Sequence, residues 1–460
     1  MNVTTLEAQE FFQRGLISLA QVEANGICLD VPYLQGAIRK MEKRIKRLEA
    51  ELRADEVYKQ WERHFKDKAT LGSYPQLAVV VYDILGYECH ERTATNRPKA
   101  DKNTLERLDH PFIKKWLRLK KLEKANSTYL VRLLREAVNG KVHPVFNLHF
   151  VETFRSSSHS PNIQNQPNRD QEIAEIIRRS FVSSGDDYVF LEIDLSQAEV
   201  RASCAYHHDP VLINYVSGGG DMHFDMSLEI FKLKKAQVSK PIRQNTKNQF
   251  VFPEFYGSYY AQTAAGMWDY IGRNGVTLSD GTCLYQHLKS KGISTLGDCQ
   301  GRPQPGTFEH HVQKVEDKFW NERLKVYTDW KKQWYAAYQK TGGFRLLTGF
   351  WVEGIMSRNE CLNTPIQGVA FHWLLWSLIR LQDWLNRKRM RTKIVGQVHD
   401  SLLIDCHKHE LPDVLEMAYR IFTKLLPQHW DWIVTPIEVE AEASPPGGSW
   451  YEKSKVAITA

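Results

Sequence analysis

The sequence predicts an α+β fold in which a helical N-terminal region precedes short strands and loops that a second helical region interrupts. Residues 1–141 show the apolar spacing and charge density of helices. At about residue 142 the pattern changes to short strands and polar loops, and helical spacing returns over residues 205–345. Residues 346–460 combine a long helix with an apolar hairpin, so the second helical region divides two sheet-forming segments.

The N-terminal region contains one amphipathic helix and two strongly basic helices. Apolar residues recur at helical spacing over residues 11–24, and Asn25-Gly26 is a typical helix stop. Residues 33–68 and 114–124 are rich in Lys and Arg. A solvated helix face explains one such run, but two in one region favour contacts with a phosphate backbone.

The rest of the chain alternates between strands, loops and helices. Residues 142–150 alternate like a strand, and residues 155–167 form a polar loop without core residues. A glycine-rich stretch at about residues 272–306 interrupts the second helical region. The last elements are expected to be a long helix, a hairpin, a helix and a strand, at residues 359–390, 392–405, 411–425 and 433–441.

Composition excludes several classes of protein. The chain has 460 residues with a formal net charge of +7, a basic balance that permits nucleic-acid binding without proving it. Its seven cysteines lack CxxC spacing, which argues against a zinc ribbon and fits a reducing compartment. The N-terminus lacks a signal-peptide pattern, and no run approaches the roughly 18 apolar residues of a membrane span. We therefore expect a cytoplasmic protein, in a bacterial or host cell, with no membrane partner.

Two hydrophobic runs far apart in the chain each end at a carboxylate. Residues 188–193 lead to Asp194, and residues 394–399 lead to Asp400 in the predicted hairpin. Mg²⁺ prefers oxygen ligands, and two Mg²⁺ ions about 3.5–4 Å apart can activate a hydroxyl and neutralise a leaving pyrophosphate. Either aspartate alone is explained as a strand-end residue that caps a turn. The pair, with a basic helix between them in the chain, favours a metal site for nucleotidyl transfer.

The segment between the two carboxylates contains a basic helix followed by aromatic residues. Arg243 and Lys247 are four residues apart and share a helix face that suits a triphosphate. Phe252 and Tyr256 are also four apart and extend that face with rings on which a base pair can stack. An amphipathic helix with its aromatic residues in the core is the alternative. Pro253 should kink this helix or open a bulge.

These motifs, in this order, resemble those of family A DNA polymerases of the bacterial DNA polymerase I type. Residues 194–201, Asp-Leu-Ser-Gln-Ala-Glu-Val-Arg, are similar to motif A. Residues 243–257, with Arg243-x3-Lys247 and Tyr256-Gly257, resemble motif B, and residues 397–401, Gln-Val-His-Asp-Ser, resemble motif C. Residues 153–167 and 363–368 are similar to two further family segments, so the likeness covers nearly the whole chain.

The resemblance implies a right-hand polymerase fold and template-directed addition of dNTPs to a primer 3′ end. The helical thumb would span residues 1–141 and the helical fingers residues 205–345. The antiparallel-sheet palm would be built from residues 142–204 and 346–460. Primer–template DNA and dNTPs would be the partners. Two Mg²⁺ ions would be the cofactors, with Mn²⁺ as an alternative.

The resemblance also implies roles for individual residues. Asp194, Asp400 and the Leu195 carbonyl would hold the metal ions, and both aspartates and Lys247 would be catalytic. Glu199 would be a steric gate that excludes a ribose 2′-hydroxyl. The nucleotide-binding residues would be Gln197, Glu199, His223, Arg243, Lys247, Phe252 and Tyr256. The primer–template residues would be Arg155, Gln164, Asn165, Arg179, Asn363, Gln367 and His399.

The spacing within motif B departs from the family pattern. Lys247 and Tyr256 are separated by one residue more than usual. Counting from Lys247 puts Val251 at the nucleotide-stacking position, whereas counting back from Tyr256 puts Phe252 there. We prefer Phe252 because it is aromatic, and a bulge near Pro253 would accommodate the extra residue.

Three further departures affect the expected chemistry. Ser401 replaces the acid that usually follows the motif C aspartate, which predicts a lower metal affinity. Leu195 replaces an aromatic residue, which predicts looser packing of Glu199 and weaker sugar discrimination. Residues 272–306 resemble an insertion in the fingers. We expect a surface loop there, with a clamp, a partner dock or a handle on unusual DNA as alternatives.

Family members commonly carry a proofreading 3′–5′ exonuclease before the thumb. The thumb-like segment starts here within the first 30 residues, so we expect a polymerase without intrinsic proofreading, from a phage or mobile element. A separate exonuclease, a helicase–primase or a processivity factor would be its protein partners. The alternatives are an exonuclease-free repair or lesion-bypass polymerase, a single-subunit RNA polymerase and an inactive DNA-binding clamp. Glu199 argues for deoxyribonucleotides, and retention of both aspartates argues against the clamp.

Overall fold

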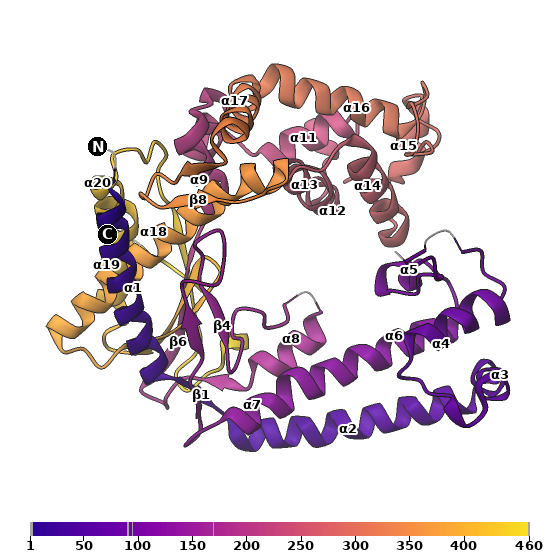
Figure 1. Ribbon diagram of the computed structural model, residues 1–460, viewed down its shortest axis with the longest axis horizontal. Helices are drawn as coiled ribbons and strands as arrows, with labels where there is room; N and C mark the ends of the chain where they lie inside the picture. The colour runs from indigo at the N-terminus through magenta and orange to yellow at the C-terminus, as the bar shows by residue number, and fades with distance from the viewer. Residues whose placement is uncertain (1–2, 90–91, 94, 169, 459–460) are drawn as a thin grey trace.

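The computed structural model describes residues 3–89, 92–93, 95–168 and 170–458. It has the shape of an open hand, in which two helical arms extend to the same side of a body that contains the main sheet (Figure 1). We call the arm of residues 31–136 the thumb, the arm of residues 210–324 the fingers, and the remaining body the palm. The expected right-hand α+β fold is confirmed.

The palm is organised around a five-stranded antiparallel sheet with the strand order β12-β11-β6-β10-β9. Its strands are β6 (Tyr188–Leu195), β9 (Lys393–Val398), β10 (Ser401–His407), β11 (Val439–Ala443) and β12 (Ser454–Val456). Because β6 lies between β10 and β11, the motif A and motif C segments are hydrogen-bonded neighbours. Their register places Ser401 opposite Asp194.

Helices pack around this sheet and bury it in the largest hydrophobic core. The long helix α18 (Arg358–Lys388), predicted at residues 359–390, contacts both hairpin strands. Other palm helices are α1 (Thr5–Asn25), α8 (Gln171–Arg178), α9 (Ala198–His207), α19 (Leu411–Arg420) and α20 (Leu426–His429). Helix α1 contacts α18 and β9, so it lies on the palm although the sequence placed it with the thumb.

Short strands complete the palm. They are β1 (Ile27–Leu29), β2 (Lys141–Val142), β3 (Val145–Asn147), β4 (Ser157–His159), β5 (Phe181–Val182), β7 (Gly343–Arg345) and β8 (Trp351–Glu353). The strand expected over residues 142–150 is divided into β2 and β3, because Pro144 has no N–H for a ladder. The strand expected at residues 433–441 begins later, as β11, and β12 was not predicted.

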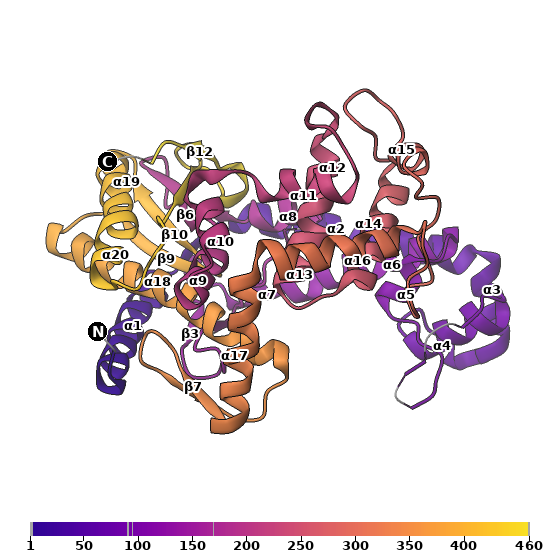
Figure 2. The same cartoon turned by 90° about the horizontal axis from the view of Figure 1, so that it is seen from above.

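The thumb is a pair of long helices with a small helical tip. Its helices are α2 (Val31–Ala54), α3 (Glu56–Phe65), α4 (Tyr74–Val79), α5 (Lys102–Glu106), α6 (Pro111–Lys124) and α7 (Val131–Glu136). α2 and α6 pack side by side, and the tip has its own core around Trp61 and Trp116. The view from above places this tip at the opposite end of the molecule from the main sheet (Figure 2).

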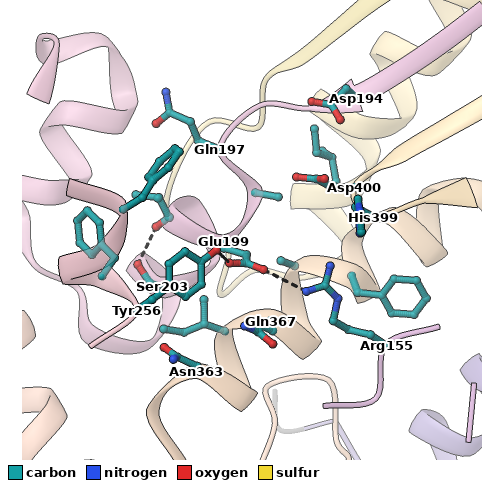
Figure 3. A pocket seen from close by; sticks show the side chains of 18 of the residues that line it. Arg155, Asp194, Gln197, Glu199, Ser203, Tyr256, Asn363, Gln367, His399 and Asp400 are labelled. Carbon is teal, nitrogen blue, oxygen red and sulfur yellow. Dashed lines mark hydrogen bonds and ion pairs between the residues drawn. The ribbon is translucent and has the colours of Figure 1, made fainter. Parts of the chain in front are cut away.

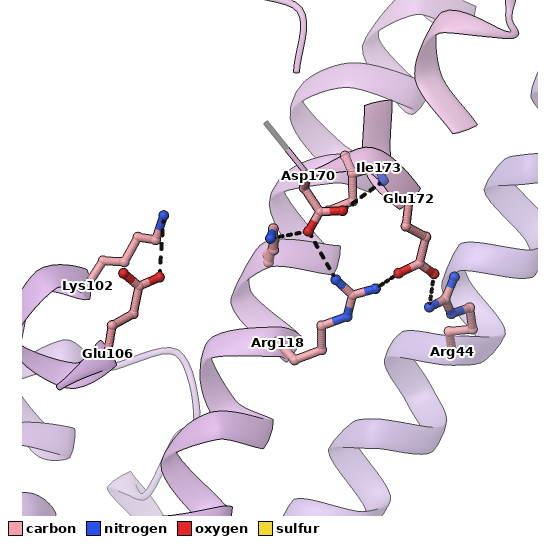
Figure 4. A network of polar contacts seen from close by, with 8 residues as sticks. Arg44, Lys102, Glu106, Arg118, Asp170, Glu172 and Ile173 are labelled. Carbon is pink, nitrogen blue, oxygen red and sulfur yellow. Dashed lines mark hydrogen bonds and ion pairs between the residues drawn. The ribbon is translucent and has the colours of Figure 1, made fainter. Parts of the chain in front are cut away.

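Ion pairs tie the base of the thumb to α8 of the palm (Figure 4). Glu172 accepts contacts from Arg44 of α2, at 2.5 Å, and from Arg118 of α6. Asp170 caps α8 and pairs with Lys121 and, at 3.5 Å, with Arg118. Part of the basic character predicted for the thumb helices is therefore neutralised by two palm carboxylates.

The fingers are helical and have a separate core. They contain α10 (Pro210–Asn214), α11 (Met222–Ile230), α12 (Lys240–Thr246), α13 (Phe252–Phe255), α14 (Tyr260–Asn274), α15 (Leu284–Ser290) and α16 (Phe308–Lys318), and α17 (Lys325–Thr341) leads back to the palm. The expected surface loop at residues 272–306 is wrong. This stretch contains α15, and its apolar side chains Leu278, Leu284, Leu288 and Ile293 are buried in the fingers core. No helix in the described part of the chain is long and apolar enough to span a bilayer.

Candidate active site

The two predicted carboxylates meet at one edge of the main sheet. Asp194 is the penultimate residue of β6, and His399 and Asp400 form the turn between β9 and β10. His399 has a φ of 53°, the left-handed conformation that a two-residue hairpin turn requires. The Leu195 amide donates a 3.0 Å hydrogen bond to the Asp400 carbonyl and so fixes the turn against the end of β6.

The electrostatics of this edge favour a bound cation. Burial raises the pKa of Asp194 to about 8, with further contributions from Asp400, Glu192 and Glu440. Burial also raises the pKa of Asp400. Neither aspartate forms an ion pair with any residue that the structure describes. Recessed carboxylates that repel each other and have no direct ion-pair partner are the donor set that a hard divalent cation fits.

The described residues contain no group of three or more His, Cys, Asp or Glu side chains arranged to hold a metal. Two carboxylates and a backbone carbonyl leave at least half of the positions of an octahedral ion unfilled. Mg²⁺ sites that act on phosphates commonly use one or two carboxylates and take their other ligands from water and substrate. The arrangement therefore fits a metal that binds together with a phosphate-bearing substrate.

A pocket of about 570 Å³ lies between this edge, the fingers and α18 (Figure 3). It brings together most of the residues predicted for the metal ions, the nucleotide and the primer end. Those that line it are Arg155, Asp194, Leu195, Gln197, Glu199, Lys247, Phe252, Tyr256, Asn363, Gln367, His399 and Asp400. They come from the loop before β4, from β6, from α9 and the turn before it, from the fingers helices, from α18 and from the β9–β10 turn.

Glu199 lies across the floor of the pocket and is held from two sides (Figure 3). Its carboxylate accepts a 3.2 Å contact from Arg155 and a short hydrogen bond from the Tyr256 hydroxyl. Burial, followed by the Glu199 charge, raises the pKa of Tyr256, so this phenol stays protonated and donates. A movement of the fingers that shifts Tyr256 would have to break this bond.

A π-helical turn at Lys247–Val251 accommodates the extra residue of the fingers helix. The Phe252 amide donates to the Lys247 carbonyl, five residues back, and Pro253 follows at the start of α13. A π-helical turn closes i→i+5 hydrogen bonds and therefore takes up one residue more than an α-helical turn. The turn directs Phe252 into the pocket, whereas Val251 is buried in the fingers core. The expected bulge near Pro253 is present.

The cationic side chains of the fingers helix differ in their surroundings. Lys247 lines the pocket, 5.2 Å from the centre of the Phe252 ring, and forms no ion pair with a described residue. Arg243 lies outside the pocket lining and pairs with Asp221 at 2.5 Å. His223 packs edge-on against Phe252, and burial lowers its pKa to about 4. His223 is therefore neutral near pH 7.

A second hollow of about 320 Å³ adjoins the pocket on the β4 side and shares Arg155, Gln367 and His399 with it. The predicted residues Gln164 and Asn165 line this hollow. Gln397, to which the sequence assigned no role, is buried beneath it. Its side-chain carbonyl accepts from Ser156 at 2.6 Å and from Gln164 at 2.7 Å. A lone glutamine within an apolar strand was the only sequence signal of this network.

Arg179, like Arg243 and His223, is a predicted site residue that lines neither hollow. It follows α8, where it pairs with Glu175 at 3.2 Å and lies over the Tyr451 ring. Its contact with primer–template DNA stays a prediction.

The sequence profile of DNA polymerase family A matches residues 33–269 and 353–452, and the chain belongs to that family. The unmatched stretch between the two ranges includes the predicted insertion at residues 272–306.

Individual relatives agree with the family assignment. The chain is 26% identical to DNA polymerase I of Bacillus subtilis over 94% of its own length and 44% of that protein. It is 26% identical to the DNA polymerase of Bacillus phage SP01, over 78% of the chain and 37% of the relative. The chain thus spans less than half the length of these relatives.

A solved structure shows the same fold. It is the POL domain of Pol1 from M. smegmatis, in complex with DNA primer-template and dNTP. The TM-score is 0.73 at 22% identity, and the likeness covers 98% of this chain and 70% of that one.

Proposed function

We propose that this chain is a template-directed DNA polymerase that adds dNTPs to a primer 3′ end. One observation carries the proposal. Asp194 and Asp400 lie at one sheet edge with no ion-pair partner among the described residues, and the same pocket is lined by Lys247, a cation whose described side-chain contact is with the Phe252 ring. A site with carboxylates on one side and a free cation on the other suits a substrate that arrives as a metal-bound polyphosphate.

Asp194, Asp400 and the Leu195 carbonyl would hold Mg²⁺, or Mn²⁺ in its place. When bound, two such ions would lower the pKa of the primer hydroxyl and offset the charge of the pyrophosphate. Lys247 would act as a point charge on the triphosphate, with Arg243 and neutral His223 beside it. Gln197 would contact the same nucleotide from the palm side of the pocket.

The primer end would occupy the side of the pocket that faces the second hollow. Arg155, Gln367 and His399 border both hollows, and Gln164 and Asn165 continue this lining. Asn363 lies one turn before Gln367 on α18. Polar side chains there can test the shape of a base pair from its minor groove, where all pairs present acceptors at similar positions.

Primer extension tests the proposed function. A labelled primer on a DNA template is incubated with Mg²⁺ and either dNTPs or rNTPs, using the wild type and Asp400→Ala. Extension with dNTPs that disappears in Asp400→Ala is the expected result. A wild type that binds the primer–template but extends it with neither nucleotide set would favour the inactive clamp. Replication in a phage is the setting that the SP01 relative favours.

Glu199→Ala should raise ribonucleotide incorporation by about tenfold or more, because it removes the group placed to exclude a 2′-hydroxyl. The measurement is the ratio of kcat/KM for a dNTP and the matching rNTP. Glu199→Gln is the matched control, since it keeps the bulk of the side chain and should preserve most of the discrimination. Equal ratios in wild type and Glu199→Ala would place the sugar gate elsewhere, with Leu195 as the first residue to examine.

Phe252→Ala should weaken nucleotide binding, whereas Val251→Ala should lower the stability of the fold. Loss of a stacking ring should raise the dNTP concentration for half-maximal rate about tenfold, because base–aromatic stacking contributes roughly 1–3 kcal/mol. Val251→Ala should instead lower the free energy of unfolding by about 1–2 kcal/mol, because Val251 is buried in the fingers core. Nucleotide titrations and chemical denaturation of both variants distinguish the two positions. A nucleotide defect confined to Val251→Ala would reverse the assignment.

A further inference from the structure

A third carboxylate lies beneath the two aspartates. Glu192 precedes Asp194 by two residues on β6, so both side chains are on the same face of the sheet. Ser401 faces Asp194 across the strand pair and directly follows Asp400. The Ser401 hydroxyl donates a 2.9 Å hydrogen bond to Oε1 of Glu192. The Val398 carbonyl is a second acceptor for the same hydroxyl, at 3.0 Å. Glu192 is therefore connected to the turn that carries Asp400.

Glu192 is held by the C-terminal part of the chain. Lys453 forms a short ion pair with it, and the Trp450 indole donates to Oε2 at 2.8 Å. The Glu192 side chain is 16% exposed and that of Lys453 is 8% exposed. A charge this well enclosed is costly unless every partner stays in place.

We propose that Glu192 is a positioning residue of the metal site and takes over the part of the missing motif C acid. Ser401 stands where the family usually has a carboxylate. In this chain the negative charge lies on the neighbouring strand and reaches the Asp400 turn through the Ser401 hydroxyl. Lys453 balances that charge through a direct ion pair, whereas neither aspartate has an ion-pair partner among the residues that the structure describes. The inference deepens the proposed function and rests on it.

The alternative is that Glu192 and Lys453 only fasten the C-terminal segment to the sheet. The two roles differ in what the Ser401 contact does. A fastening pair needs Lys453 and Trp450 but not Ser401, whereas a positioning residue acts on Asp400 through Ser401. Glu442 supplies a matched control, since it also pairs with Lys453, at 2.9 Å, and has no contact with Ser401.

The test compares Glu192→Gln, Ser401→Ala, Glu442→Gln and the exchange E192S/S401E. Mn²⁺ affinity is measured by electron paramagnetic resonance on the complex of the protein, a dNTP and a primer–template. The primer ends in a dideoxynucleotide, so no extension takes place. The Mg²⁺ dependence of extension and the melting temperature are measured in parallel. Glu192→Gln should weaken Mn²⁺ binding about tenfold while kcat at saturating Mg²⁺ changes much less, as expected for a group behind a metal ligand.

Ser401→Ala should weaken Mn²⁺ binding in the same direction without disturbing the Lys453 pair. The exchange variant should return the affinity toward that of the wild type, because it restores a carboxylate next to Asp400. Glu442→Gln should leave Mn²⁺ binding unchanged. Wild-type Mn²⁺ affinity in Ser401→Ala would overturn the proposal, even if Glu192→Gln fails to fold. Tight Mn²⁺ binding by a wild type that does not extend primers would instead count against the proposed polymerase activity and leave the role of Glu192 intact.

Discussion

Asp194→Asn should lower primer extension by on the order of 10³-fold, because it removes a carboxylate of the proposed metal site. The fold should survive, since Asn has nearly the same shape and Asp194 has no ion-pair partner among the described residues. Single-turnover extension at saturating Mg²⁺ and dNTP measures the loss. Glu440→Gln is the matched control, because Glu440 lies on β11 directly opposite Asp194 but pairs with Lys455 at 2.7 Å. Near wild-type extension by Asp194→Asn would remove this residue from the metal site.

The same substitution should stabilise the chain when no divalent cation is present. In the folded state burial, then Asp400, Glu192 and Glu440, raise the pKa of Asp194 to about 8. A raised carboxyl pKa means that the folded state holds the proton more tightly, so wild-type stability falls as pH rises from about 4 toward 8. Asp194→Asn has no such loss. Its advantage in melting temperature should grow over this pH range and shrink when Mg²⁺ is added to both proteins.

The sequence predicted that Asp194 and Asp400 meet at one edge of a sheet, because the signals for this arrangement are local. Each aspartate ends an apolar run, and a strand and a hairpin bring two such ends together once they pair. The four-residue spacings of Arg243 and Lys247, and of Phe252 and Tyr256, likewise predicted a shared helix face from local sequence. The π-helical turn that places Phe252 in the pocket follows from the backbone geometry. These features depend on spacing within a few residues.

What the sequence could not predict depends on contacts between distant segments. Gln397 meets Ser156 and Gln164 from more than 200 positions away, and Glu192 meets Lys453 from a similar separation. The 272–306 stretch was mistaken for a surface loop because its glycines obscured the apolar residues that fill the fingers core. The absence of proofreading, and the partners expected from it, stay predictions.

Lys247→Ala should lower the rate of nucleotide addition by on the order of 10²-fold and leave primer–template affinity nearly unchanged. Lys247 lines the same pocket as the two aspartates, and its described side-chain contact is with the Phe252 ring, whose centre is 5.2 Å away. Its charge is thus available to a triphosphate, whereas Arg243 is already paired with Asp221. An ammonium acts on phosphate as a point charge, so its loss should slow the transfer step and weaken dNTP binding together.

Lys240→Ala is the control that separates this local effect from the general basic charge of the fingers. Lys240 begins α12 at an exposed position two turns before Lys247 and does not line the pocket. If bulk electrostatic attraction of the dNTP were sufficient, both variants would lose rate alike and the loss would vanish at high salt. If Lys247 contacts the triphosphate, only Lys247→Ala is slow, and it remains slow at high salt. Fluorescence anisotropy of a labelled primer–template, measured on both variants, shows whether DNA binding is retained. A normal rate for Lys247→Ala would mean that the triphosphate is held elsewhere, with Arg243 and His223 the nearest candidates.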